Sequence, residues 1–251
     1  MQAPSASKLL AVWERARTQP MTTRMLILLE AASPAASRQD LAKLSVGQRD
    51  ARLLALRELL FGSRLTGVTA CPRCRQQLEI DIESADIQID SHQPDLELFS
   101  ATSGGYVARF RLPNSDDLSA IAVDRHRDEA ATILELLSGC LVELRRNGRR
   151  QKLRSSLRLP PALIEAIAAE MDKADPQANV HLPLDCVDCG HRWLSPFDIA
   201  SFLWSEVDHL ASCLLREVYA LASAFGWRET DILAMSAQRR QLYRQMIYDA
   251  T

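Results

Sequence analysis

Apolar residues recur at three- and four-residue steps over most of the chain, which predicts a mainly helical protein. Helices are expected over these segments: 8–17, 22–32, 46–61, 115–123, 128–137, 161–171 and, after Ser195-Pro196, a long helix that ends at Gly226. The long helix has the clearest apolar stripe: Ile199, Leu203, Val207, Leu210, Leu214, Val218 and Leu221. Steps of four and three keep these seven side chains on one side for about six turns. Thr230 and Ser236 are each expected to cap a further short helix.

Alternation with a period of two appears in only a few short stretches, and these predict strands. The expected strands are Leu78–Ile82, Tyr106–Leu112 and Arg192–Leu194. Asn147-Gly148 is a favoured type I′ turn pair, so we expect a small β-hairpin joining Val142–Leu144 to Lys152–Leu153. Residues 84–104 show neither period and are expected to form a loop.

These elements predict an α+β protein with a mainly helical body, small β-hairpins and a long C-terminal helix. The predicted parts are an N-terminal helical region, a split zinc ribbon, an inserted α/β subdomain and a C-terminal helical region. Their ranges are 1–70, then 71–83 with 184–195, then 84–183, and finally 196–251.

Composition narrows the class of protein without identifying a partner. The 251 residues are 47% apolar, enough for a sizeable core, and the formal charge of −2 gives no global attraction to nucleic acid or an anionic membrane. No apolar run approaches the ~20 residues needed to span a bilayer, and the first residues do not resemble a secretory signal. We therefore expect a cytoplasmic protein that does not enter membranes.

Two cysteine pairs carry the strongest chemical signal in the sequence. Cys71-Pro-Arg-Cys74 and Cys186-Val-Asp-Cys189 each place two thiols with two residues between them, a spacing that presents both sulfurs to one cation. Each pair runs into a predicted strand, as in a zinc ribbon. The halves are separated by 111 residues, from Arg75 to Asp185, so a ribbon built from them must enclose an inserted subdomain.

Zn²⁺ bound by all four cysteines is the preferred interpretation, and two alternatives stay open. One is thiol redox chemistry, although a redox Cys-x-x-Cys normally starts a helix, whereas these pairs lead into strands. The other is that the cysteines share no site. Four thiolates would fill the shell of a Zn²⁺ ion and leave no position for water, so a structural ion is expected rather than a catalytic one.

His191 and the two remaining cysteines can be explained without a bound metal. His191 could replace one cysteine as a ligand, but with four cysteines present a partly exposed hairpin histidine is the simpler interpretation. Cys140 and Cys213 lie within helical apolar patterns, where a buried, unreactive thiol is usual.

A run of seven basic residues without an intervening acid spans the predicted hairpin. Its members are Arg145, Arg146, Arg149, Arg150, Lys152, Arg154 and Arg158. The simplest interpretation is a solvated hairpin; a docking surface for an acidic partner comes next, and contact with nucleic-acid phosphates is a further alternative. Interleaved aromatic residues, which would favour nucleic acid, are missing from the run.

Three further features of the sequence allow more than one interpretation. Trp204 lies off the apolar stripe of the long helix and could contact a partner. The short helices after Phe225 could imitate a helix-turn-helix, although simple helix packing is commoner. Asp124 to Asp128 could suggest acid–base chemistry, but a surface charge cluster is the usual explanation, and no recognisable catalytic motif occurs in the sequence.

Several stretches together resemble a known family. They are Arg49–Arg57, Cys71-Pro-x-Cys74 leading into Leu78–Asp81, Phe110–Pro113, Cys189-Gly-His-x-Trp193 with Pro196–Ile199, Leu215–Ala222, Gly226-Trp227, Ile232-Leu233 and Arg239–Tyr243. In these the chain is similar to the baseplate hub assembly chaperones of contractile phage tails and phage-tail-like contractile injection systems.

The resemblance implies a non-enzymatic assembly factor or adaptor. Its expected partners are baseplate hub, spike or tail-tube proteins, and it implies no catalytic residues. The zinc ligands are not taken from the resemblance, because they rest on cysteine spacing alone. The alternative function is a zinc-ribbon nucleic-acid-binding protein that uses the basic hairpin 145–158.

Overall fold

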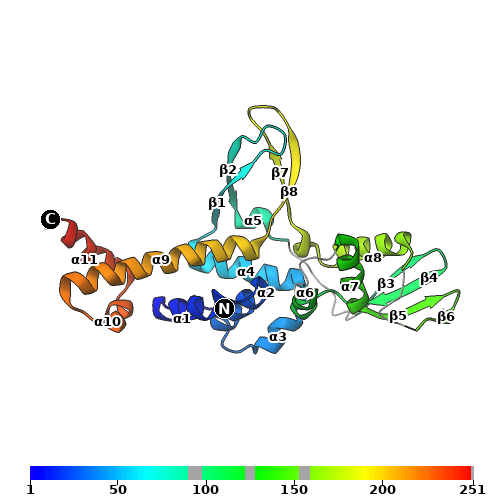
Figure 1. Cartoon of the computed structure of the whole chain (residues 1–251), viewed down its shortest axis with the longest axis horizontal. Helices are drawn as coiled ribbons and strands as arrows, with labels where there is room; N and C mark the ends of the chain where they lie inside the picture. Colours follow the sequence, from blue (N-terminus) through cyan, green and yellow to red (C-terminus); the bar gives the residue numbers. More distant parts are fainter. Residues whose placement is uncertain (90–97, 122–127, 153–158, 250–251) are drawn as a thin grey trace. The chain divides into compact units, whose positions relative to one another are not determined.

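The computed structural model describes residues 1–89, 98–121, 128–152 and 159–249 (Figure 1). The chain divides into two compact units. The first unit combines Met1–Ala36 with the segment from Ala200 onward, and the second comprises Ser37–Ile199.

The first unit is built from helices. They are α1 (Ala6–Ala16), α2 (Met21–Ala32), α9 (Ile199–Phe225, which starts at the end of the second unit), α10 (Glu229–Ala234) and α11 (Ala237–Asp249). The predicted stripe of α9 faces inward, since its seven residues are buried or half-buried. Gly226 adopts a positive φ of 67° where α9 ends, a conformation that glycine reaches at least cost. The long helix is therefore confirmed, although it begins at Ile199 rather than at Pro196.

Three side-chain hydrogen bonds join helices of this unit. The indole N–H of Trp13 in α1 donates a hydrogen bond to Asp208 in α9 at 2.8 Å. Glu217 in α9 accepts from Arg240 at 2.9 Å and from Arg244 at 3.3 Å, both in α11. The Arg240 side chain is only 6% exposed, so its charge depends on this carboxylate for compensation.

The second unit mixes helices with short strands. Its helices are α3 (Arg38–Lys43), α4 (Val46–Phe61), α5 (Ser84–Ile87), α6 (Ser115–Ile121), α7 (Glu129–Cys140), α8 (Pro161–Ala174) and the 3₁₀-helix η1 (Pro176–Asn179). Its strands are β1 (Arg64–Ala70), β2 (Gln77–Glu83), β3 (Phe99–Ser103), β4 (Tyr106–Phe110), β5 (Leu141–Arg146), β6 (Arg149–Arg150), β7 (His181–Asp185) and β8 (Arg192–Pro196). Ser45 and Gln48 form a capping box that starts α4, and Gly62 ends it.

Two antiparallel hairpins project from this unit side by side, β1–β2 in cyan and β7–β8 in yellow (Figure 1). In the first, Arg64 to Ala70 pair with Glu83 to Gln77; in the second, His181 to Asp185 pair with Pro196 to Arg192. Each hairpin carries one cysteine pair in its turn.

A four-stranded antiparallel sheet in the order β3-β4-β5-β6 forms the other β part of the unit. Its inner face and the helices α7 and α8 enclose a core of these buried residues: Ala101, Ala108, Phe110, Leu137, Leu141, Leu144, Leu159, Leu163 and Ile167. Asn147 and Gly148 both have positive φ, 48° and 77°, at the β5–β6 turn. This geometry confirms the predicted type I′ turn, but the strand after it is Arg149–Arg150 rather than Lys152–Leu153. Lys152 lies outside a strand, and Leu153 lies outside the described residues.

The structure is α+β, as predicted, but several local expectations are wrong. The expected loop 84–104 contains α5 and β3, and its residues 90–97 lie outside the described part of the chain. Strands β1 and β7 were not predicted. Arg228, not Thr230, precedes α10 at the capping position, whereas Ser236 accepts a hydrogen bond from the N–H of Arg239 as expected. Among the described helices, none combines the length and hydropathy needed to cross a bilayer.

Candidate metal centre

The turns of the two projecting hairpins have the same backbone geometry. The carbonyl of Cys71 accepts from the N–H of Arg75 at 2.9 Å, and the carbonyl of Cys186 accepts from the N–H of Gly190 at the same distance. One residue further on, the N–H of each first cysteine donates at 2.9 Å, Cys71 to the carbonyl of Gln76 and Cys186 to the carbonyl of His191. Each turn therefore presents its two sulfurs in the same way.

The structure brings all four predicted cysteines into one cluster. Their sulfurs lie within 4.8 Å of one another, with 3.7 Å between Cys71 and Cys189 and 3.6 Å between Cys74 and Cys186. Cys71 and Cys186 are buried, whereas Cys74 is exposed. Cysteines 112 and 118 positions apart in sequence thus meet at the turns of two separate hairpins.

The sulfur spacing fits a tetrahedral ion. With metal–sulfur bonds of about 2.3 Å, the edge of the tetrahedron is about 3.8 Å, close to the two short distances. The cluster could therefore hold one metal ion. Burial raises the pKa of the Cys71 thiol, but hydrogen bonds from the backbone of Cys74 and Arg73 and from neighbouring thiols outweigh it and lower the pKa to about 7. At Cys71 a thiolate, which is the ligand form, is accessible near neutral pH. At Cys74 a hydrogen bond from the backbone of Gln76 lowers the pKa of the thiol, but burial and hydrogen bonds with the other three cysteines outweigh it and raise the pKa to about 12.

Among the described residues, the other sulfur and imidazole groups are not members of this four-cysteine group. The ring of His191 stacks on that of Trp193, with centroids 5.8 Å apart. Cys140 at the end of α7, in the second compact unit, is fully buried, and burial raises the pKa of its thiol to about 12. Cys213 lies on α9 beside His209, in the other compact unit. The four-cysteine grouping is the metal-ligand cluster found among the described residues.

The basic run of the β5–β6 hairpin does not form one surface. Arg145 pairs across the strands with Arg150, and Arg146 pairs with Arg149. Adjacent residues of a strand point to opposite faces, so the run is divided between the two faces of the sheet. Lys152 follows β6 and is exposed, while Arg154 and Arg158 lie outside the described residues.

Trp204 is part of the interior of the chain. Its residue is only 8% exposed, and the guanidinium of Arg24 lies 4.7 Å from the centre of its ring. This buried position disagrees with the expectation that Trp204 is available to a partner. The reason is that α9 buries residues flanking its main stripe as well as the stripe itself.

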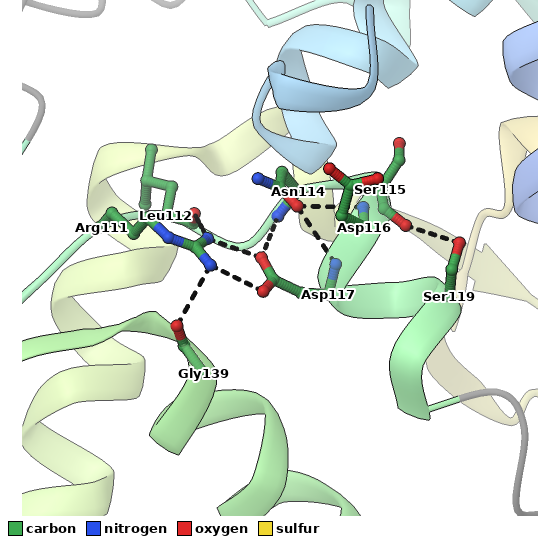
Figure 2. A network of polar contacts seen from close by, with 8 residues as sticks. All are labelled: Arg111, Leu112, Asn114, Ser115, Asp116, Asp117, Ser119 and Gly139. Carbon is green, nitrogen blue, oxygen red and sulfur yellow. Dashed lines mark hydrogen bonds and ion pairs between the residues drawn. The ribbon is translucent and has the colours of Figure 1, made fainter. Parts of the chain in front are cut away.

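A dense polar network surrounds Asp117, and it has a structural explanation (Figure 2). Arg111 donates to both carboxylate oxygens of Asp117, at 2.6 and 2.7 Å, and to the carbonyl of Gly139 at 3.1 Å. The side-chain oxygen of Asn114 accepts from the N–H groups of Asp116 and Asp117, which caps α6. These contacts join the end of β4, the start of α6 and the end of α7. The Asp124–Asp128 cluster weighed for acid–base chemistry falls almost wholly outside the described residues.

The sequence did not predict the ion pair between two charged residues of the four-stranded sheet. Arg109 and Glu143, from β4 and β5, lie opposite each other and share a face with Arg145. The signal was available in part, because Arg109 alternates with buried Ala108 and Phe110. The pairing of Arg109 with Glu143 joins segments 34 positions apart and could not be read from either strand alone.

Comparison with known proteins adds an independent result. A family model described as T4 bacteriophage base plate protein matches residues 6–204, which include both hairpins and all four clustered cysteines. No match was found among curated proteins or among solved structures. Since the match spans well over half of the 251 residues, this chain belongs to the T4 bacteriophage base plate protein family.

Proposed function

We propose that the protein is a non-enzymatic assembly factor or adaptor for the baseplate hub of a contractile phage-tail-like particle. The family match over residues 6–204 is the observation that carries a role in the baseplate. The resemblance of its motifs to hub assembly chaperones supports the narrower role. Under this proposal the protein acts in the bacterial cytoplasm, is able to remain in the particle, and contacts hub, spike or tail-tube proteins.

The proposal includes one structural Zn²⁺ ion held by Cys71, Cys74, Cys186 and Cys189. Four sulfurs, sulfur separations near those of a tetrahedral shell, and two turns of matched geometry support this ion over a redox pair. A redox cysteine pair normally begins a helix, whereas each of these pairs joins two strands.

The position of the four cysteines supports a structural role for a bound ion. Strands β1–β2 and β7–β8 form separate two-stranded sheets, and an isolated two-stranded hairpin is marginal in water. A shared ion would join the two turns and close a loop of more than a hundred residues, which favours the folded state. Because four thiolates fill the shell, the ion would have no open position for a substrate, in keeping with a non-enzymatic role.

Co-purification tests the proposal directly. The tagged protein is expressed together with the hub, spike and tail-tube proteins of its own gene cluster, and complexes are isolated by affinity and size-exclusion chromatography. We expect a stable complex with at least one of these proteins. A protein that ignores every structural component of its cluster contradicts the proposal.

The alternative function is nucleic-acid binding through the hairpin 145–158. It requires salt-sensitive binding of DNA or RNA that is lost when the arginines are neutralised. The division of the run between two faces reduces the basic surface available to one nucleic-acid strand, which is why we place the adaptor first.

A further inference from the structure

The outer face of the four-stranded sheet carries three arginines around one carboxylate. Along β4, Ala108 and Phe110 are buried in the core, so Arg109 between them points to the opposite face. Cross-strand pairing places Glu143 beside Arg109, and Arg150 beside Arg145, on that same face. We call Arg109, Arg145 and Arg150 the arginine face.

The three guanidinium groups share the carboxylate of Glu143 unequally. Arg145 donates to Oε1 of Glu143 at 2.9 Å, whereas Arg109 and Arg150 approach it only to 3.8 and 3.9 Å. The last two separations exceed hydrogen-bond length. The side chains of Arg109, Arg145 and Arg150 are 54%, 53% and 76% exposed, respectively, so their N–H donors are accessible to another acceptor.

The arginine face carries more positive than negative charge, and the repulsion between its arginines destabilises the sheet. Arg145 and Arg150 stand directly opposite each other across the strands, and like charges in that position destabilise a sheet. One carboxylate between three guanidinium groups leaves a local surplus of two positive charges. The same groups hold the pKa of Glu143 below its ordinary value, first through the hydrogen bond from Arg145 and then through the charges of Arg145, Arg150 and Arg109. Glu143 is therefore ionised already and has no further charge to contribute.

The chemistry of the face favours a protein partner over nucleic acid. Phe99 and Phe110 pair across the strands on the core face, and Tyr106 shares that face, where the guanidinium of Arg146 lies 5.2 Å from its ring. Among the described residues of the sheet, all three aromatic side chains thus point away from the arginine face. Single-stranded nucleic acid is normally held by aromatic stacking as well as by charge. Half-exposed Val107 beside Arg145 instead offers apolar contact to a peptide.

We propose that the arginine face docks an acidic segment of a partner protein, whose carboxylates take the place left by the missing counter-charges beside Glu143. This deepens the proposed function by giving the chemistry of one partner, and it rests on that function only for the partner's identity as a baseplate protein.

Two double variants of equal charge change provide the test. Arg145→Gln with Arg150→Gln removes two charges from the arginine face, and Arg146→Gln with Arg149→Gln removes two charges from the reverse side of the same hairpin. Binding of a fluorescent polyglutamate peptide to the full chain is measured by anisotropy, and a DNA oligonucleotide of the same charge serves as the competing probe. Circular dichroism establishes that both variants are folded.

We expect the Kd for polyglutamate to rise by about tenfold in the first variant and by less than about threefold in the second. Glu143→Gln removes the internal competitor and should lower the Kd about twofold or more. Equal losses in both double variants, or tighter binding of the oligonucleotide than of polyglutamate through Arg145 and Arg150, overturn the proposal.

This assay needs no baseplate protein, so its failure is distinct from failure of the proposed function. If the chain binds polyglutamate on the arginine face but co-purifies with no component of its gene cluster, the docking inference is supported and the proposed function is contradicted. If the chain does not bind polyglutamate, and Arg145→Gln with Arg150→Gln leaves formation of the hub complex unchanged, the proposed function is supported and the docking inference is contradicted.

Discussion

Arg75 and Gly190 occupy the same position in the two cysteine turns, and both adopt a left-handed backbone, with φ of 63° and 65°. Each donates its N–H to the carbonyl of the first cysteine of its turn. A side chain in this conformation costs about 1–2 kcal/mol relative to the right-handed regions, and glycine largely avoids that cost. One turn therefore has the favoured residue at this position, and the other carries a strained arginine.

The equivalence predicts a loss of stability on substitution of Gly190 and no loss on substitution of Arg75 by glycine. Gly190→Ala should lower the free energy of unfolding by about 1 kcal/mol, although a Cβ there meets no atom within 4 Å. Arg75→Gly should leave stability unchanged or raise it by up to about 1 kcal/mol, because relief of strain offsets the greater chain entropy of glycine. Urea denaturation measures both. Equal destabilisation by the two changes would show that the turns are not equivalent.

Gly47 is constrained by packing rather than by backbone angle. Its N–H donates to Oδ2 of buried Asp175 at 2.8 Å, and a Cβ at this position would lie 2.0 Å from Oδ1 of the same carboxylate. In an open helix, Gly→Ala stabilises by about 0.5–1 kcal/mol. Here the overlap must displace Asp175 or α4, so Gly47→Ala should destabilise the protein by about 2 kcal/mol or more.

Gly139→Ala is the matched control for that prediction. Gly139 is an exposed residue near the end of α7, and a Cβ there would meet Asp117 at an ordinary contact distance of 3.5 Å. The melting temperatures of Gly47→Ala and Gly139→Ala are compared with that of the parent. We expect Gly139→Ala to be neutral or slightly stabilised. Similar melting temperatures for the two variants would contradict the close contact at Gly47.

The Arg111–Asp117 pair gives stability a dependence on acid. Burial raises the pKa of Asp117, but the hydrogen bonds from Arg111 and from the backbone of Asn114 outweigh it and leave the pKa below its ordinary 3.8. A carboxyl with a lowered folded pKa contributes stability that is complete above its unfolded pKa and is lost as pH falls through the folded value.

Asp117→Asn should therefore destabilise the protein by about 1–3 kcal/mol near pH 7. The gap between variant and parent should narrow below about pH 4, where the parent carboxyl becomes protonated. Unfolding free energies measured from pH 7 to pH 3 test this. A gap that stays constant over this range would mean that the charge of Asp117 contributes nothing.

Much of the fold could be predicted because local signals agreed with the final packing. The stripe from Ile199 to Leu221 and the Asn147-Gly148 turn each depend on residues close in sequence. The cysteine cluster was also predictable, since metal geometry relates Cys71 and Cys74 to Cys186 and Cys189 regardless of the chain between them.

The remaining features depend on distant partners. Strand β1 lacks a clear alternation because Gly67 interrupts it, and it becomes a strand by pairing with β2. The run from Arg145 to Arg150 looks like one patch in sequence, yet strand geometry separates it into two faces. Trp204 lies off the main stripe of its helix and is buried all the same, which the pattern of one helix cannot reveal.

The metal content of the purified protein tests the central claim most directly. Zinc is measured by mass spectrometry in the parent, in Cys186→Ser and in the control Cys213→Ser, whose cysteine lies outside the cluster. We predict one zinc ion per chain in the parent and in the control. Cys186→Ser should lose the ion and melt at a markedly lower temperature, because the two hairpin turns are no longer joined. A parent protein that carries no zinc after purification without chelators, and melts at the same temperature as Cys186→Ser, would contradict the account.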